Sequence, residues 1–108
     1  MGDDAIRTAV VTSADEAGEQ AWPMPLPSEL RPGLDSTIAD IANIGDKFGG
    51  MLVAGLFLKE FVGTTPWAHL DIAGPSFNEG APWDYTPKGA TGAGVRTLIT
   101  YLETIARS

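Results

Sequence analysis

The single histidine of the chain, His69, stands two residues before Asp71 in an otherwise apolar run, and both residue types can bind a metal or move a proton. If this run is a strand, positions i and i+2 point to the same face, so the imidazole and the carboxylate lie together. A catalytic metal centre usually takes three protein ligands, and the other candidates are Asp35, Asp40 and a few loop acids. The spacing leaves open a metal site and a buried, hydrogen-bonded structural pair, and it favours the structural pair.

A second candidate is the glycine-rich segment 88–97, KGATGAGVRT, which opens an expected helix. Free backbone N–H groups at such a helix start can bind an anion. The segment lacks the P-loop pattern, and it lacks the preceding strand that a dinucleotide-binding fingerprint requires. We therefore interpret it by default as a glycine-rich entry into a packed helix, with phosphate binding as the alternative. Arg96 stands in the first turn, where the helix dipole disfavours a cation, and we expect an acidic or carbonyl partner for it. The nucleophile pattern G-x-S-x-G is absent from the sequence.

Composition narrows the classes of protein to consider. The 108 residues suffice for one domain with one core. A formal net charge of −7 is a poor match for the phosphate backbone of a nucleic acid. The absence of cysteine excludes disulfides and thiolate metal sites and fits a reducing compartment. The apolar run 51–58 is too short to span a bilayer, and acids stand where a secretory signal carries bases. We therefore expect a cytoplasmic protein that binds neither nucleic acid nor membrane.

The elements that must position these residues are indicated by hydrophobic periodicity. Apolar residues at helical spacing predict three helices, and partly alternating or short apolar runs predict two strands. The helices are expected over 3–21, 45–63 and 92–106, and the strands over 36–44 and 67–73. Thr91 is the expected cap of the last helix.

The proline-rich segments 22–33 and 75–90 are expected to be loops, because proline removes a backbone donor and restricts the residue before it. The resulting order of helix, strand, helix, strand, helix predicts an α/β fold. Two strands are few for a stable sheet. We therefore expect a segment of a larger mixed sheet flanked by helices.

Five stretches of the sequence carry a resemblance to a known family. They are WPMPLPSEL, STIADIANIG, GGMLVAGLFLKEFV, WAHLDIAGP and KGATGAGVRTL, in this order. In them the chain resembles the C-terminal portion of leucyl (cytosol) aminopeptidases over roughly residues 3–106. WAHLDIAG followed by TG and VRTL is the most specific part of the match.

The resemblance implies a two-metal exopeptidase that releases N-terminal residues, leucine among them, from peptides. In such enzymes two divalent ions, commonly zinc or manganese, activate a bridging water and polarise the scissile carbonyl. The resemblance also implies a cytoplasmic homohexamer with peptides as its substrates.

One departure from the family pattern limits what can be carried over. The family's metal ligands and catalytic lysine come from an upstream segment with the motif Asn-Thr-Asp-Ala-Glu-Gly-Arg, which this sequence lacks. Lys47, Lys59 and Lys88 do not stand in the context of the catalytic lysine. No catalytic or metal-binding residue is therefore assigned, and residues 1–108 are expected to be a C-terminal part of a catalytic domain. We expect the chain alone to be inactive and to bind no metal.

The resemblance does assign a part of the substrate site. In relatives the loop after the HLDIAG run contributes to the pocket for the substrate's N-terminal side chain. On that match Ala73 and Ser76 line the pocket; His69 and Asp71 are then expected to be supports inside the strand, and the end of the strand is the pocket wall. A free-standing, non-catalytic α/β module for binding or assembly is the alternative hypothesis.

Overall fold

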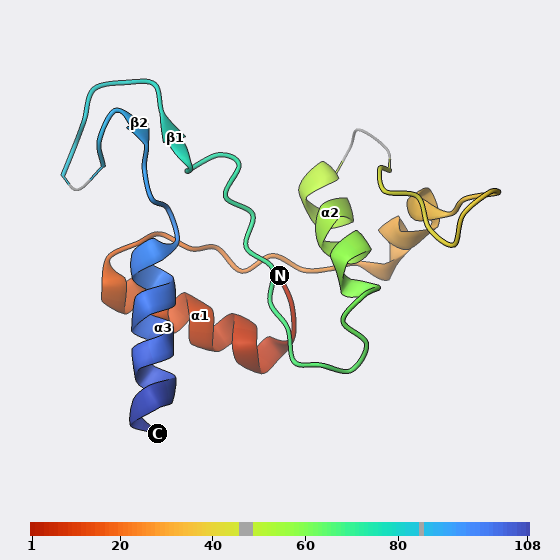
Figure 1. The fold of residues 1–108 in the computed structure, drawn as a ribbon, viewed down its shortest axis with the longest axis horizontal. Coiled ribbons are helices and arrows are strands. Elements are labelled where there is room, and N and C mark those ends of the chain that lie inside the picture. Colours follow the sequence, from red (N-terminus) through yellow and green to blue (C-terminus); the bar gives the residue numbers. More distant parts are fainter. Residues whose placement is uncertain (46–48, 85) are drawn as a thin grey trace. The chain divides into compact units, whose positions relative to one another are not determined.

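The computed structural model describes residues 1–45, 49–84 and 86–108 (Figure 1). Its elements, in chain order, are α1 (Asp4–Ala17), the 3-10 helix η1 (Ser28–Leu34), α2 (Gly50–Lys59), β1 (Phe77–Asn78), β2 (Gly89–Ala90) and α3 (Val95–Arg107). They fall into two compact units, which are described separately: Met1–Arg7 with Pro23–His69, and Thr8–Trp22 with Leu70–Ser108. Among the described residues, no helix has both the length and the apolar character needed to cross a bilayer.

The core of the first unit lies between η1 and α2, which are neighbours in Figure 1. Leu34 at the end of η1 has no exposed surface, and it packs with Val53 and Leu56 of α2. Four partly buried apolar residues complete this cluster: Leu26, Leu30, Ile41 and Phe57. Arg31 joins the two helices on the outside by binding Glu60 and, at 3.0 Å, Asp35. The hydrogen bond that Arg31 donates to the Glu60 carboxylate raises the pKa of Arg31.

The first residues of the chain pair with residues 67–69 in the same unit. Gly2 and Ala68 form an isolated antiparallel bridge, and the N–H of His69 donates to the carbonyl of Met1 at 2.9 Å. The N–H of Asp3 donates to Trp67 O, and the N–H of Trp67 donates to Asp3 Oδ2, both at 2.9 Å. A Cβ atom at Gly2 would lie 2.4 Å from Trp67 O, so this close approach of two backbones requires glycine.

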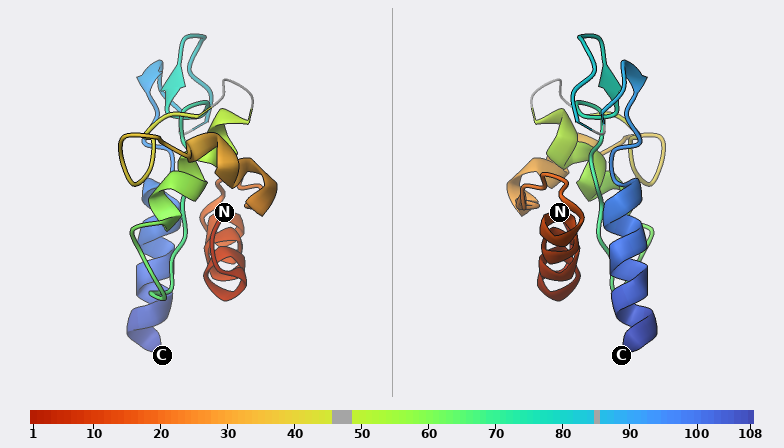
Figure 2. Two further views of the ribbon diagram at one scale, coloured as in Figure 1. Left: turned by 90° about the vertical axis from the view of Figure 1, so that its right-hand side faces the viewer. Right: turned by 90° about the vertical axis from the view of Figure 1, so that its left-hand side faces the viewer.

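The second unit contains most of α1, a short hairpin and α3. β1 and β2 pair antiparallel with Phe77 opposite Ala90, and both views of Figure 2 show them side by side. The apolar face predicted for the last helix is present on α3, but its side chains are 46–61% exposed: Val95, Leu98, Ile99, Leu102 and Ile105. The α/β class predicted from the sequence is confirmed, with helices and a small sheet in one chain.

Both predicted strands are wrong in position. Residues 36–44 form bends, because the Ser36 hydroxyl accepts the N–H groups of Ile38 and Ala39 at 3.2 and 2.9 Å, and such local bonds compete with a ladder. The Ile38 residue is 96% exposed. Over residues 67–73 only Ala68 makes a bridge, and the run then turns. The two observed strands lie instead within residues 75–90, which were expected to be a loop.

The three predicted helices exist, and each is shorter than expected at one or both ends. α1 ends at Ala17 and is followed by Gly18 with a φ of 76°, a backbone conformation that favours glycine. α2 begins at Gly50 and ends at Lys59; part of the predicted helix 45–63 lies at residues 46–48, outside the described residues. Within the proline-rich segment 22–33, expected to be extended, η1 begins at Ser28.

Candidate functional site

The predicted pocket residues Ala73 and Ser76 lie in one surface turn. The N–H of Ser76 donates to Ile72 O, and the N–H of Ala73 donates to Asp71 Oδ1, both at 2.9 Å. The Ser76 hydroxyl reaches Ala73 O at 3.4 Å. Ala73 is exposed and Ser76 is half-buried. The structure therefore brings the two residues together, with only a methyl group at the exposed position; their contact with substrate remains a prediction.

Thr91 ties this turn to the segment that leads into α3. Its N–H donates to Ser76 O at 3.0 Å, one residue beyond the Phe77–Ala90 pair of the hairpin. Its hydroxyl donates to Pro75 O, and the hydroxyl oxygen accepts the N–H of Ala93 at 3.3 Å. Thr91 was expected to cap α3, but the residue at the cap position is Gly94, so that prediction is wrong. The side chain of Thr91 holds the turn instead.

The capping group of α3 comes from a distant part of the sequence. Both carboxylate oxygens of Glu19, two residues after α1, accept bonds from α3: Gly94 N–H at 2.9 Å, Thr97 N–H at 2.8 Å and the Thr97 hydroxyl at 2.9 Å. Burial alone would raise the pKa of Glu19, but these hydrogen bonds and the charge of Arg96 outweigh it, so the pKa lies below its ordinary value. Glu19 is therefore held as a carboxylate at neutral pH.

This contact decides between the two interpretations of the glycine-rich segment 88–97. Two N–H groups that could have bound a phosphate at the start of α3, those of Gly94 and Thr97, are already bound by the Glu19 carboxylate. The default of a packed helix entry is therefore the better description. The expected partner of Arg96 is also found, because its guanidinium donates to Gly18 O at 3.5 Å.

His69 and Asp71 do not form the buried pair that the sequence favoured. His69 is half-buried, and its ring stacks on Trp67 with a centroid distance of 6.2 Å. Asp71 is exposed, and its carboxylate accepts the N–H of Ala73 within its own turn. The prediction of burial is wrong for Asp71 because a short acidic side chain at a turn binds the local backbone rather than a partner across a sheet.

The described residues do not fit a metal centre. Over 1–45, 49–84 and 86–108 no three side chains of His, Cys, Asp or Glu come close enough together to hold an ion. Lys59 and Lys88 are exposed, and Lys47 lies outside the described residues. The metal alternative for His69 and Asp71 therefore finds no third ligand in the part of the chain that the structure describes.

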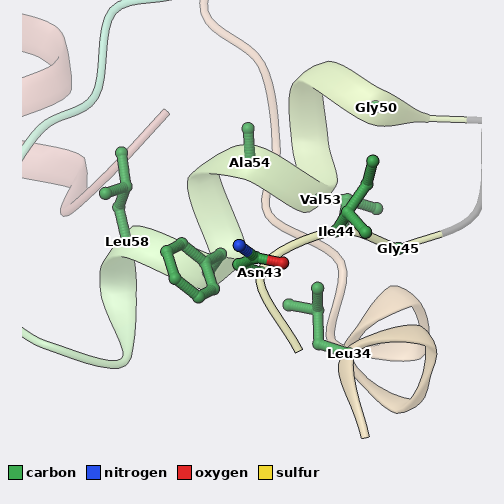
Figure 3. A pocket seen from close by; sticks show the side chains of 9 residues that line it. Leu34, Asn43, Ile44, Gly45, Gly50, Val53, Ala54 and Leu58 are labelled. Carbon is green, nitrogen blue, oxygen red and sulfur yellow. The ribbon is translucent and has the colours of Figure 1, made fainter. Parts of the chain in front are cut away.

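A cavity of about 320 Å³ in the first unit lies along α2 (Figure 3). Its lining is apolar apart from the Asn43 side chain, and the residues are Leu34, Asn43, Ile44, Gly45, Gly50, Val53, Ala54, Phe57 and Leu58. None of these side chains is an acid, a base or a nucleophile, so the cavity supplies no group that could carry out a reaction.

The sequence analysis missed the support of the turn at residues 72–76. Glu19 stands 75 and 78 residues before its partners, so no local pattern marks it. Thr91 was predicted to cap α3 because it stands near the start of that helix, but its side chain binds the Pro75 carbonyl instead. The signal present in the sequence was that Glu19 follows Gly18 and that Thr91 precedes Gly92. Glutamate and threonine side chains can both bind backbone groups.

The described elements define an α/β chain with a two-stranded antiparallel sheet, and comparison with known proteins identifies the family. Residues 1–99 match the model of the cytosol aminopeptidase family, catalytic domain. The chain belongs to this family and corresponds to a C-terminal portion of a leucyl aminopeptidase.

Individual relatives agree with the family model. The chain is 66% identical to a probable cytosol aminopeptidase of Streptomyces avermitilis, over 96% of this chain and 20% of that protein. It is 56% identical to that of Mycobacterium leprae, over 98% of this chain and 21% of that protein. The chain therefore spans about a fifth of the length of these curated relatives.

Solved structures share the fold as well. The bottromycin maturation enzyme BotP matches with a TM-score of 0.92 and 39% identity, over 98% of this chain and 24% of that one. A mutant of tomato leucine aminopeptidase matches with a TM-score of 0.83 and 37% identity, over 93% of this chain and 19% of that one.

Proposed function

We propose that residues 1–108 are the C-terminal part of the catalytic domain of a metal-dependent aminopeptidase that releases N-terminal amino acids, leucine and others, from peptides. The observation that carries the proposal is the 66% identity to a probable cytosol aminopeptidase along 96% of the chain. Within that enzyme the chain contributes scaffold and one wall of the pocket for the substrate's first side chain.

The pocket wall is assigned to the turn that contains Ala73 and Ser76. Ala73 is exposed and small, so it leaves room for a branched side chain beside it. The carbonyl groups of Pro75 and Ser76 are bound by Thr91, which fixes the backbone of the turn. A fixed wall with a small residue at its exposed position suits selection of a side chain by size.

We propose that the metal ions of such an enzyme are held by residues outside this chain; this agrees with the described residues, among which no three metal-binding side chains lie together. Two divalent ions, manganese or zinc, are proposed for the longer enzyme. A solved structure of BotP, 40% identical over 96% of this chain, is a complex with manganese, which supports a divalent metal. We further propose a cytoplasmic homohexamer that acts on peptides; the family name supports the cytosolic location.

A chimera tests the proposal. This chain replaces the aligned segment of the Streptomyces avermitilis relative, and hydrolysis of leucine amide and alanine amide is measured with manganese present. We expect the chimera to hydrolyse leucine amide, and the 108-residue chain alone to show neither turnover nor micromolar binding of Mn²⁺ or Zn²⁺ by calorimetry. A folded but inactive chimera would contradict the proposal and favour the non-catalytic module. Turnover by the isolated chain would contradict the assignment of the metal site to the rest of the enzyme.

A substitution at the pocket wall tests the role of Ala73. In the chimera, Ala73→Leu fills the space beside the substrate side chain. Because pocket differences of this size discriminate by about 10-fold or more, we expect the ratio of leucine to alanine kcat/KM to fall by about that factor. Equal losses for both substrates would show that Ala73 lies outside the pocket.

A further inference from the structure

The turn at residues 72–76 has little support of its own. Its internal bonds run from Ser76 N–H to Ile72 O, from Ala73 N–H to the Asp71 carboxylate and, at 3.4 Å, from the Ser76 hydroxyl to Ala73 O. Residues 70–75 are exposed, so the packing of side chains contributes little to fixing them within their unit. The position of this turn therefore depends on the contacts that its last residues make elsewhere.

Those contacts converge on Thr91. Two successive carbonyls of the turn, at Pro75 and Ser76, accept the hydroxyl and the N–H of this one residue. The hydroxyl oxygen also accepts the N–H of Ala93, so the side chain has one defined orientation. Thr91 itself is half-buried.

Thr91 is in turn fixed on both sides. The residue before it, Ala90, pairs with Phe77 in the hairpin. Three residues after it, Gly94 is bound by the Glu19 carboxylate, which also holds Thr97 in the first turn of α3. The backbone of Thr91 is thus held between two fixed points, and a rotation of its side chain would break the bonds of the hydroxyl to Pro75 O and to Ala93 N–H at once.

From this geometry, and resting on the proposed function, we infer that Thr91 is a positioning residue that sets the size selectivity of the aminopeptidase by holding the pocket wall through the Pro75 carbonyl. The side chain need not touch the substrate. It acts through the backbone of the turn, and its hydroxyl is the group that matters.

The chimera described above provides the test. Thr91→Val keeps the shape of the side chain and removes the hydroxyl, so Pro75 O and Ala93 N–H lose their partner. We expect the ratio of leucine to alanine kcat/KM to change by about 3–10-fold, mainly through KM, because a loosened wall changes binding of the side chain rather than the chemical step. Thr91→Ser retains the hydroxyl and should restore the ratio.

A matched control removes another hydroxyl that binds a carbonyl. Thr104 on α3 donates to Thr100 O at 2.9 Å, and Thr104→Val should leave the ratio unchanged. Far-UV circular dichroism checks the fold of each variant, and Thr91→Ala replaces Thr91→Val if the latter does not fold.

The outcomes separate this inference from the proposed function. An active chimera in which Thr91→Val lowers both substrates equally, or in which Thr91→Ser fails to restore the ratio, overturns the positioning role alone. An inactive parent chimera overturns the proposed function, and the positioning role with it. The inference is supported if Thr91→Val changes the ratio of leucine to alanine kcat/KM, Thr91→Ser restores it and Thr104→Val leaves it unchanged.

Discussion

Substitution of Glu19 by alanine removes the group that caps α3 from a distance. The change leaves the N–H groups of Gly94 and Thr97 and the Thr97 hydroxyl without their acceptor. Thr97 is only 3% exposed, so its groups are the ones least able to find water in exchange. The first turn of α3 should therefore open more often in the variant.

The expected magnitude follows from the geometry. Hydrogen bonds to a charged group contribute about 1.5–3 kcal/mol each, but Glu19 is itself partly exposed, and freed N–H groups at a helix start can bind water. The measured cost of losing a capping side chain, about 0.5–2 kcal/mol, is the better guide. We expect a loss of about 1–2 kcal/mol, which corresponds to about 5–30-fold in the population of the open state.

Amide hydrogen exchange measures this population directly. The amides of Gly94 and Thr97 should exchange about 5–30-fold faster in Glu19→Ala than in the parent chain at neutral pH. Glu16→Ala is the matched control, because Glu16 is an exposed glutamate on α1. Unchanged exchange in Glu19→Ala, or equal acceleration in Glu16→Ala, would refute the capping role.

The same contact predicts a pH dependence. The pKa of Glu19 is lower in the folded chain than the value of about 4.3 expected for an unfolded glutamate. The stabilisation is therefore fully present above that value and is lost as the pH falls through the lower, folded pKa. Exchange of the Thr97 amide, corrected for its intrinsic rate, should accelerate on acidification in the parent chain. Glu19→Gln, which cannot titrate, should lack this acceleration.

Two further predictions concern packing. Leu34→Ala removes the fully buried side chain between η1 and α2 and should lower the free energy of unfolding of the first unit by about 2–5 kcal/mol. Leu98→Ala, at a 46%-exposed position, should lower the free energy of unfolding clearly less. Denaturation monitored by circular dichroism compares the two variants. The exposed apolar face of α3 should make the 108-residue chain self-associate. Leu102→Lys, on that face, should reduce the mass measured by light scattering, and the control Arg107→Lys should leave the mass unchanged. A monodisperse monomer for the parent chain would contradict the second prediction.

The helices were predictable because their signals are local. The apolar residues of α3 recur at helical spacing, and the structure confirms the element. Its start was misplaced because Gly94, with a φ of 88°, sets the N-terminal boundary, and periodicity does not register backbone conformation. The helices were therefore found by pattern, whereas the end of α1 at Gly18 and the start of α3 at Gly94 were decided by single glycines.

The strands and the support of the candidate site were not predictable in the same way. Ser36 and Asp71 each bind a nearby N–H, and this local choice replaces the ladder that the apolar pattern indicated. The turn with Ala73 and Ser76 came from the resemblance to the family, and its role stays a prediction. The residues that hold it, Glu19 and Thr91, depend on contacts between distant segments, which one sequence does not reveal.

The distance in sequence between Glu19 and α3 has a consequence for the order of folding. Closing a loop of the 75 residues that separate Glu19 from Gly94 costs about 4 kcal/mol in chain entropy, more than the capping contact returns. The contact therefore cannot bring the two segments together; it forms after other interactions have done so. A contact that forms after the transition state leaves the folding rate nearly unchanged and acts on the unfolding rate. Loss of the Glu19 contact is therefore expected to speed the release of α3 during unfolding rather than to slow its formation.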